Sequence, residues 1–317
     1  MLNVFRRGEG AFRTLPAEPG WKPDPDVIWI DLVKPTREEE LAVEAALGLG
    51  LPTVEEMEAL EPSSRLYQES GSTFMTATLL AKSGEAPFAT PATFVLAGGR
   101  LVTLRYDDLK AFTIYADRVS GESAPGSGSA ALLGLLDAVV ERLARILDDT
   151  DDQVQAASQA IFKRPDGGDF RPLLTALAQA QSMTGLVRTS LVSLGRLLSF
   201  AALAHEISQD RECSAHLKSL QRDTQSLTEH TSHLSGHIAF LLDAALGLIN
   251  IEQNGIIKFF SVAAVIFLPP TLVASYFGMN FHHMFEFEWA YGEPIAILIM
   301  IISVVVPLWW FKKRGWL

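Results

Sequence analysis

The sequence contains almost no cysteine: Cys213 is the only one among 317 residues. An intramolecular disulfide is therefore excluded, and the single thiol fits a protein of a reducing compartment. The stretch Met1–Phe12 lacks an apolar segment of signal-peptide length, so nothing in it predicts export. An excess of positive charge is also missing, since the formal net charge is −11. Nucleic acid is thus not an expected partner, whereas attraction of cations is.

Two stretches near the C-terminal end have no charged residue at all. The 19 residues from Phe259 to Phe277 are uncharged, and as a helix they would extend about 28 Å, close to the thickness of the hydrocarbon layer of a bilayer. The second stretch, Ile295 to Phe311, has 17 uncharged residues and would extend about 26 Å. Both stretches are predicted to span a membrane.

The first span carries small or polar residues at spacings of three, four or seven, which place them on one face of a helix. These residues are Asn254, Ser261, Ala264, Leu268, Thr271, Ser275 and Gly278. Lipid offers polar groups no hydrogen-bond partner, so this face should contact another helix or water. Both remain open here, although Asn254 and Asn280 at the two ends favour a water-filled path. Pro269 and Pro270 free backbone carbonyls that neighbouring helices or water must satisfy.

Residues 1–119 predict an α+β domain in the cytosol. The apolar, β-branched run Val27–Val33 is typical of a buried strand, and residues 73–81, 90–96 and 100–105 are also expected to be strands. Gly98 and Gly99 suit a tight hairpin turn between the last two. Thr36 and Thr53 should begin helices, because each precedes a glutamate at capping-box spacing. The domain shows no catalytic constellation, so an enzyme is not expected.

The rest of the chain is predominantly helical. Residues 120–129 are rich in Gly, Ser and Pro and are predicted to be a linker. A cytosolic helical hairpin is expected over 130–208, with its break at 164–168. A stalk helix over 209–255 then has no stop signal before the first span at 256–278. The two would form one helix of about 65 residues, or ~100 Å, which should pack against copies of itself.

The residues that follow the first span predict the membrane topology. Residues 279–293 form an acidic loop, residues 294–311 the second span, and residues 312–317 a basic tail. The positive-inside rule places this tail in the cytosol. With two spans the N-terminal part is then cytosolic too, and only the acidic loop faces outward.

The first span ends in Gly278-Met279-Asn280, and this tripeptide lies 37 residues before the last residue. With a polar-striped, proline-containing span before it and a second span and basic tail after it, the chain resembles the CorA family of divalent-cation channels. Ile249–Asn254 (INIEQN), Phe267–Ser275 (FLPPTLVAS) and Phe311–Leu317 (FKKRGWL) are also similar to bacterial members. The resemblance is strong from about Asp223 onward. Before Asp223 it is architectural, apart from Val27–Val33.

The resemblance implies a funnel-shaped homo-oligomer, a pentamer, in the bacterial inner membrane. It implies channel-type entry of Mg²⁺ down its electrochemical gradient, with Co²⁺ and Ni²⁺ open as further cargo, and it assigns the selectivity filter to Gly278, Met279 and Asn280. Hydrated Mg²⁺ releases its waters reluctantly, and the Asn280 amide and the Gly278 carbonyl can bind that water shell as neutral oxygens. The alternative is that Asn280 only caps the helix. The expected pore-lining residues are Asn254, Ile257, Ala264, Leu268 and Thr271.

Two charged groups on the cytosolic side each have two interpretations. Four cations would form a positive collar at the inner mouth that opposes cation flow, or would only anchor the helices at the interface; they are Lys258, Lys312, Lys313 and Arg314. Family members close when intracellular Mg²⁺ binds carboxylates between subunits. By charge alone, the expected Mg²⁺ sensor is the set Asp148, Asp149, Asp152 and Asp223, and the alternative is a solvated acidic face.

The outer loop leaves the ion open. Glu286 and Glu288 would concentrate cations by electrostatic focusing, but Met284–Phe287 lacks the Pro and Leu of the usual Met-Pro-Glu-Leu of the family. His282 and His283 suit Zn²⁺, Co²⁺ or Ni²⁺ better than Mg²⁺. One alternative is therefore a Zn²⁺ or other transition-metal transporter of the same superfamily. An alternative from another class is a membrane-anchored, cation-sensing scaffold that conducts nothing.

Overall fold

The computed structural model describes residues 1–6, 12–15, 21–59, 61, 65–83, 86–119, 125–163, 169–279 and 291–315. The chain forms two compact units, one of residues 1–163 and 171–241 and one of residues 164–170 and 242–317. Helix α8, Arg211–Phe277, contributes to both units and has 67 residues. This agrees with the single helix of about 65 residues expected from the sequence.

The first unit is built on a seven-stranded sheet in the order β2-β1-β3-β7-β6-β5-β4. The strands are β1 Leu2–Arg6, β2 Phe12–Leu15, β3 Val27–Val33, β4 Leu66–Glu69, β5 Ser72–Ser83, β6 Ala86–Ala97 and β7 Arg100–Arg105. The central pair β3 and β7 is parallel, whereas the other neighbours are antiparallel. Gly98 and Gly99 have positive φ angles of 56° and 76°, as expected for a tight hairpin turn.

The sequence predicted β3 and β7 at their observed bounds, but it missed β1, β2 and β4, which have only four or five residues each. It also predicted β5 and β6 too short. Beyond the pair Ala92–Arg105, strand β6 has no further partner in β7 and pairs with β5 alone. Pro87 and Pro91 lie in this part of β6. Proline is tolerated there because one side of the strand forms no backbone hydrogen bonds to a neighbouring strand.

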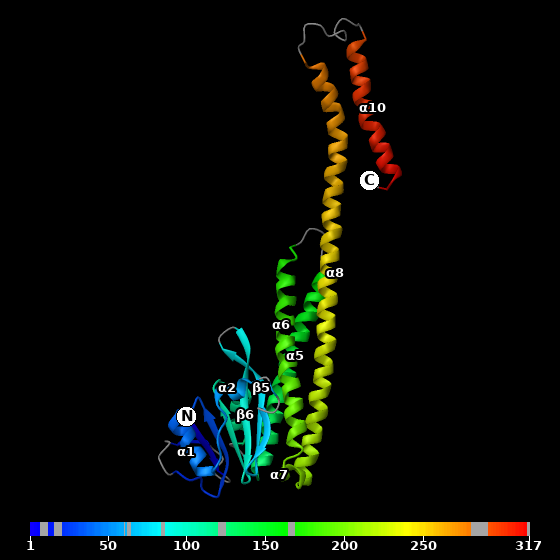
Figure 1. Cartoon of the computed structure of the whole chain (residues 1–317). Coiled ribbons are helices and arrows are strands. Elements are labelled where there is room, and N and C mark those ends of the chain that lie inside the picture. The colour runs from blue at the N-terminus through cyan, green and yellow to red at the C-terminus, as the bar shows by residue number, and fades with distance from the viewer. Residues whose placement is uncertain are drawn as a thin grey trace. The chain divides into compact units, whose positions relative to one another are not determined.

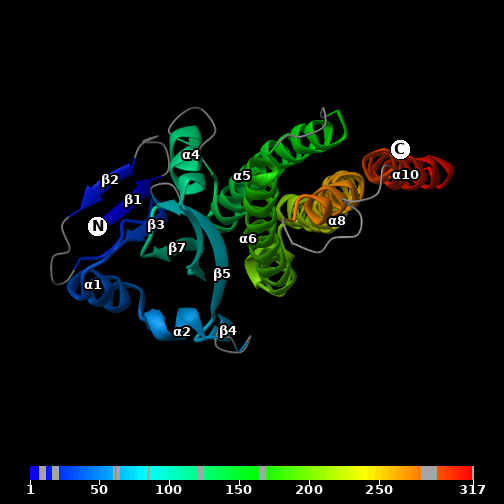
Figure 2. The ribbon, with the colours of Figure 1, turned by 90° about the horizontal axis from the view of Figure 1, so that it is seen from above.

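Helices cover both faces of the sheet (Figure 2). On one face α1 (Arg37–Leu47) and α2 (Val54–Glu58) enclose a core with Ile30, Leu32 and Val102. On the other face α4 (Lys110–Val119), α5 (Gly128–Phe162) and α6 (Arg171–Ala201) bury Trp29 and Phe94, and the first turns of α8 join this core. Both expected capping boxes, Thr36 with Glu39 and Thr53 with Glu56, are present.

The domain boundaries differ from those expected. The predicted α+β domain (1–119) and helical hairpin (130–208) belong to one compact unit, because α5 and α6 bury their apolar faces against the sheet. Helix α5 begins inside the predicted linker, with Ser127 as its N-cap. Helix α6 ends at Ala201, before the end of the expected hairpin at residue 208, and the short helix α7 (His205–Ser208) follows separately.

Gly128 allows the start of α5 to touch β7. A Cβ atom there would lie 2.4 Å from the carbonyl carbon of Arg100, and the Gly128 amide donates to the Gly99 carbonyl at 2.9 Å. We expect Gly128→Ala to destabilise the unit by about 1–3 kcal/mol, because backbone must move aside. Thermal melting of the full-length protein measures this.

In the control Gly185→Ala on α6, where a Cβ meets no atom within 4 Å, stability stays equal or rises by up to about 1 kcal/mol. Equal melting of Gly128→Ala and wild type would contradict this close approach.

A buried polar network joins the two central strands. Arg105 Nη2 lies 2.9 Å from Asp31 Oδ2, and both side chains are less than 9% exposed. Thr103 donates its hydroxyl to Asp31 Oδ1 at 2.7 Å and accepts from the indole nitrogen of Trp29 at 2.9 Å. Burying this ion pair is costly, and hydrogen bonds to both of its members offset the cost.

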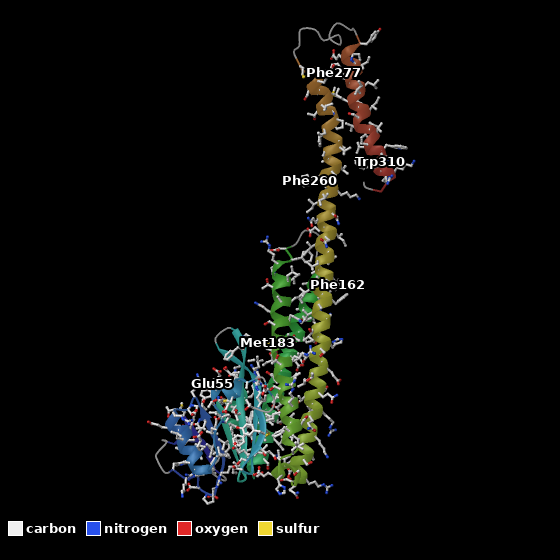
Figure 3. All side chains as sticks on the ribbon, in the orientation of Figure 1. Glu55, Phe162, Met183, Phe260, Phe277 and Trp310 are labelled. Carbon is white, nitrogen blue, oxygen red and sulfur yellow. The ribbon has the colours of Figure 1, made fainter. Side chains whose placement is uncertain are left out.

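Among the described residues, two helices are long and apolar enough to cross a membrane. They are the C-terminal part of α8 and α10 (Gly292–Lys313), both in the second unit. Only 6% and 11% of the residues in their apolar windows are buried, unlike the core helix of a soluble protein. The helices lie side by side and run antiparallel (Figure 1). Near the end of α10, Lys258 Nζ donates to the Gly315 carbonyl at 3.4 Å. Phe277 and Trp310 mark opposite ends of this pair (Figure 3).

Candidate functional site

The polar stripe of α8 is solvent-exposed along its whole length. All seven residues identified from the sequence are exposed, and Ile257 lies on the same face between Asn254 and Ser261. From Asn254 to Gly278 the spacing alternates between three and four residues, which keeps the stripe on one side of the helix. The large apolar members Ile257 and Leu268 are 54% and 63% exposed, so in a membrane this face requires a partner or water.

Helix α10 covers the opposite side of α8. The less exposed residues of the segment recur at Val262, Ile266 and Val273, and Val262 is only 8% exposed. Ala264 and Leu268 each follow one of these residues by two positions, a rotation of about 200° around the helix. The stripe therefore points away from the chain's own second membrane helix.

Two hydroxyl groups of the stripe donate hydrogen bonds within the helix. Ser261 donates to the Ile257 carbonyl at 2.7 Å, and Thr271 donates to the Phe267 carbonyl at 2.6 Å. With the proton so used, each oxygen presents its lone pairs as an acceptor. Acceptor oxygens suit the water shell of a hydrated cation, because the waters around a cation point their hydrogens outward.

Helix α8 ends just before the tripeptide. Gly278 still donates to the Ala274 carbonyl at 2.9 Å, and Met279 donates to the Tyr276 carbonyl at 3.3 Å. A Cβ atom at Gly278 would lie 3.1 Å from the Ala274 oxygen, a tight approach that favours glycine. Asn280, His282, His283, Glu286 and Glu288 lie outside the described residues.

The fold agrees with comparisons to known proteins. The profile of the family described as CorA-like Mg²⁺ transporter protein matches residues 24–313. The chain belongs to this family. Magnesium transport protein CorA from Escherichia coli (strain K12) is 35% identical to it over 325 aligned residues, with 100% of both chains covered.

Solved structures share the fold of this CorA-like chain. The complete CorA magnesium transporter from Methanocaldococcus jannaschii has a TM-score of 0.78 at 16% identity, covering 100% of this chain and 98% of that one. The cytoplasmic domain of ZntB from Vibrio parahaemolyticus has a TM-score of 0.57 at 11% identity, covering 70% of this chain and 87% of that one. These likenesses confirm the expected architecture of an α+β domain, a long helix and two apolar C-terminal helices.

The four basic residues gather at the end of the helical pair away from the tripeptide. Lys258 reaches toward the end of α10, and Lys312, Lys313 and Arg314 are exposed at that end. This group therefore lies on the α10 side of α8 rather than on the stripe. Of the two roles considered, this position favours interfacial anchoring over a collar directly around a path lined by the stripe.

The four expected sensor carboxylates do not form one site within a chain. Asp148, Asp149 and Asp152 are exposed on α5, and Asp223 is exposed on α8. The charge of Asp223 acts instead on Asp137, which precedes Asp148 by 11 residues, or about three turns of α5. Within the described ranges, no group of three or more His, Cys, Asp or Glu side chains is arranged to hold a metal ion.

Asp137 lies on the same helix as the expected sensor aspartates but was not one of the four expected sensor residues. Burial raises its pKa above the usual range, and repulsion from Glu141 and Asp223 adds to this, while His216 and Arg118 oppose it. Its partners come from α4, α5 and α8, so the sequence could indicate it only through Asp137 and Glu141 at i, i+4 spacing, where like charges repel.

The raised pKa gives a pH prediction. The folded state holds the Asp137 proton more tightly than the unfolded state, so ionisation of Asp137 destabilises the fold. This destabilisation begins as the pH rises above the normal carboxyl pKa and is complete above the raised pKa. We expect Asp137→Asn to raise stability at pH 7 by less than about 1 kcal/mol, and this gain to vanish as the pH falls below the normal carboxyl range. Melting curves from pH 3 to 8 test this. Asp148→Asn, at an exposed position, should change stability little at pH 7. A gain in Asp137→Asn that persists at pH 3 would contradict the account.

Proposed function

We propose that the protein is a homo-oligomeric channel through which Mg²⁺ enters the cytosol down its electrochemical gradient. The observation that carries this proposal is the polar stripe, which is exposed on the face of α8 opposite α10 and leads to Gly278-Met279-Asn280. One such helix cannot enclose a path, so several copies must place their stripes around an axis. The family resemblance implies five subunits and a funnel shape.

The filter in this proposal is the ring of Gly278, Met279 and Asn280 at the outer end. A cage of carboxylates would hold Mg²⁺ too strongly to release it, whereas neutral oxygens bind the water shell and let the ion pass. Asn280 would supply amide oxygens and Gly278 a close backbone carbonyl. Two of the three proteins compared above are named as magnesium transporters, which supports Mg²⁺ as the cargo, with Co²⁺ and Ni²⁺ as further ions of similar hydration.

The rest of the path alternates polar and apolar rings. Asn254 and Thr271 present oxygens, whereas Ile257, Ala264 and Leu268 present hydrocarbon. An apolar ring narrow enough to lose its water blocks ions without any charge, so Ile257 and Leu268 are the proposed gates.

The proposed location is the bacterial inner membrane, surrounded by lipid, with both termini in the cytosol. The basic residues at the end of α10 support this orientation through the positive-inside rule. The acidic loop with Glu286 and Glu288 then lies outside, where it concentrates cations at the entrance.

We propose that cytosolic Mg²⁺ closes the channel by binding carboxylates between subunits. Asp223 is the better-supported member of the predicted set. Its charge acts on Asp137, whose pKa is raised mainly by burial and further by repulsion from Glu141 and Asp223, and a divalent cation would relieve that repulsion. Asp148, Asp149 and Asp152, exposed on α5, are available only to a neighbouring subunit. In this proposal Mg²⁺ is both the transported and the regulatory ion.

Two alternatives remain. A Zn²⁺ transporter is favoured by His282 and His283 and by the fold shared with the ZntB domain. A non-conducting, cation-sensing scaffold is the alternative from another class, and the exposed polar stripe counts against it.

Uptake into liposomes that contain the purified protein separates these three functions. Mg²⁺ entry is compared with Zn²⁺, Co²⁺ and Ni²⁺ entry, with and without a proton gradient. The proposal predicts saturable Mg²⁺ entry that needs no proton gradient. Proton-driven Zn²⁺ entry with little Mg²⁺ would support the first alternative, and no flux of any ion would support the scaffold.

A further inference from the structure

The C-terminal end of α10 combines exposed indoles with exposed cations. Trp309 and Trp310 are 63% and 47% exposed. Lys313 Nζ lies 5.2 Å from the ring centroid of Trp309, and Arg314 Cζ lies 5.0 Å from that of Trp310. These cation–π contacts hold two positive groups beside two amphipathic rings.

This cluster lies on the outer side of the helical pair. Ala296 and Phe311 of α10 are only 6% and 5% exposed, so they mark its α8-facing side, whereas Val305 and Val306 are 56% and 57% exposed. Trp309 and Trp310 follow Val305 and Val306 by four residues each and continue the same outer face. An apolar strip of this face therefore leads directly into the cations.

No carboxylate among the described residues pairs with the cations of this cluster. Lys312, Lys313 and Arg314 form no ion pair within the described ranges. The described carboxylates of this unit are Asp169, Asp243, Glu252 and Glu293, and Glu293 lies in the first turn of α10, at the opposite end of that helix. Adjacent like charges repel, so an anion from outside the chain would stabilise the cluster.

We propose that this end of α10 is a binding site for an anionic phospholipid. The phosphate contacts Lys313 and Arg314, and an acyl chain lies along Val305, Val306 and the indoles. The site is adapted to a lipid rather than to free phosphate, because the apolar strip continues from the cations into the membrane span. This inference rests on the proposed membrane orientation of α10 and adds a partner to the anchoring role of the basic group.

Tryptophan quenching by brominated phospholipid tests the proposal without any ion gradient. The full-length protein is reconstituted in brominated phosphatidylcholine, and unbrominated phosphatidylglycerol or phosphatidylcholine is added as competitor. The quenching due to this site is the difference in quenching between the wild-type protein and a Trp309→Phe/Trp310→Phe variant. We expect phosphatidylglycerol to relieve that quenching at roughly tenfold lower mole fraction than phosphatidylcholine does, because each cation near a membrane surface favours an anionic lipid several-fold.

Matched variants decide the outcome. Lys313→Gln/Arg314→Gln should remove the preference for the anionic lipid, whereas the charge-conserving Lys313→Arg/Arg314→Lys should keep it. Lys218→Gln/Arg222→Gln removes the same amount of charge from α8 and should also keep the preference. Equal competition by the two lipids in the wild-type protein, or an unchanged preference in Lys313→Gln/Arg314→Gln, would overturn the proposal. Because the assay involves no ion transport, lipid selectivity without Mg²⁺ uptake would refute the channel and leave this site in place.

Discussion

Replacing Asn280 by alanine is expected to lower saturable Mg²⁺ entry into liposomes at least tenfold. The change removes from every subunit the amide oxygen that binds the ion's water shell. A hydrogen bond to a charged group contributes about 1.5–3 kcal/mol, and each 1.36 kcal/mol in a barrier changes a rate tenfold. Initial rates at several Mg²⁺ concentrations show whether the loss lies in ion binding or in passage.

A polar residue away from the stripe provides the control. Ser303 on α10 donates its hydroxyl to the Met300 carbonyl at 2.8 Å, and Ser303→Ala should transport Mg²⁺ like the wild type. If Asn280→Ala also transports normally, Asn280 is only a helix cap and the filter lies elsewhere.

Arg105→Leu is expected to destabilise the first unit by about 3–5 kcal/mol, the largest stability change predicted for this chain. The substitution leaves the Asp31 carboxylate buried without its cation, and the Thr103 hydroxyl cannot neutralise a full charge. Thermal melting followed by Trp29 fluorescence suits this test, because the Trp29 indole donates to Thr103 within the same network.

Two further variants distinguish a lost ion pair from lost packing. Asp31→Asn in the Arg105→Leu background should recover part of the stability, because an amide is less costly to bury than an unpaired charge. Arg37→Gln breaks an exposed pair with Glu40, where the Arg37 side chain is 63% exposed, and should cost less than about 1 kcal/mol. A similar small loss in Arg105→Leu would contradict the role given to the buried pair.

The sequence predicted those parts of the fold whose signals are local. The capping boxes at Thr36 and Thr53, the Gly98-Gly99 turn and the strand Val27–Val33 depend on residues within one turn or one strand of each other, and all were found. Strand β1 was missed because five residues carry too short a pattern, and its place next to β3 is fixed by pairing across the sheet. The packing of α5 and α6 against the sheet likewise depends on contacts between residues that are far apart in the sequence.

The same distinction applies to the site. The polar stripe follows from helical periodicity alone, so its residues could be predicted before the structure was known. The direction in which it faces could not, because that depends on which side of α8 is covered by α10. The grouping of Asp223 with Asp137 rather than with Asp148 also depends on how α5 and α8 pack.

The central claim, that the stripe lines the ion path, is tested most directly by cysteine accessibility during Mg²⁺ uptake. Cys213 is the only native cysteine. It is buried, and burial raises the pKa of its thiol. A Cys213→Ser background removes this native thiol and should fold and transport normally. Single cysteines are then placed on the stripe, as Leu268→Cys and Thr271→Cys, or on the α10 side, as Val262→Cys and Ile266→Cys. A charged, membrane-impermeant thiol reagent is predicted to block Mg²⁺ uptake in the stripe variants and leave the α10-side variants unaffected. Block at Val262 and Ile266 with none at Leu268 and Thr271 would contradict the account.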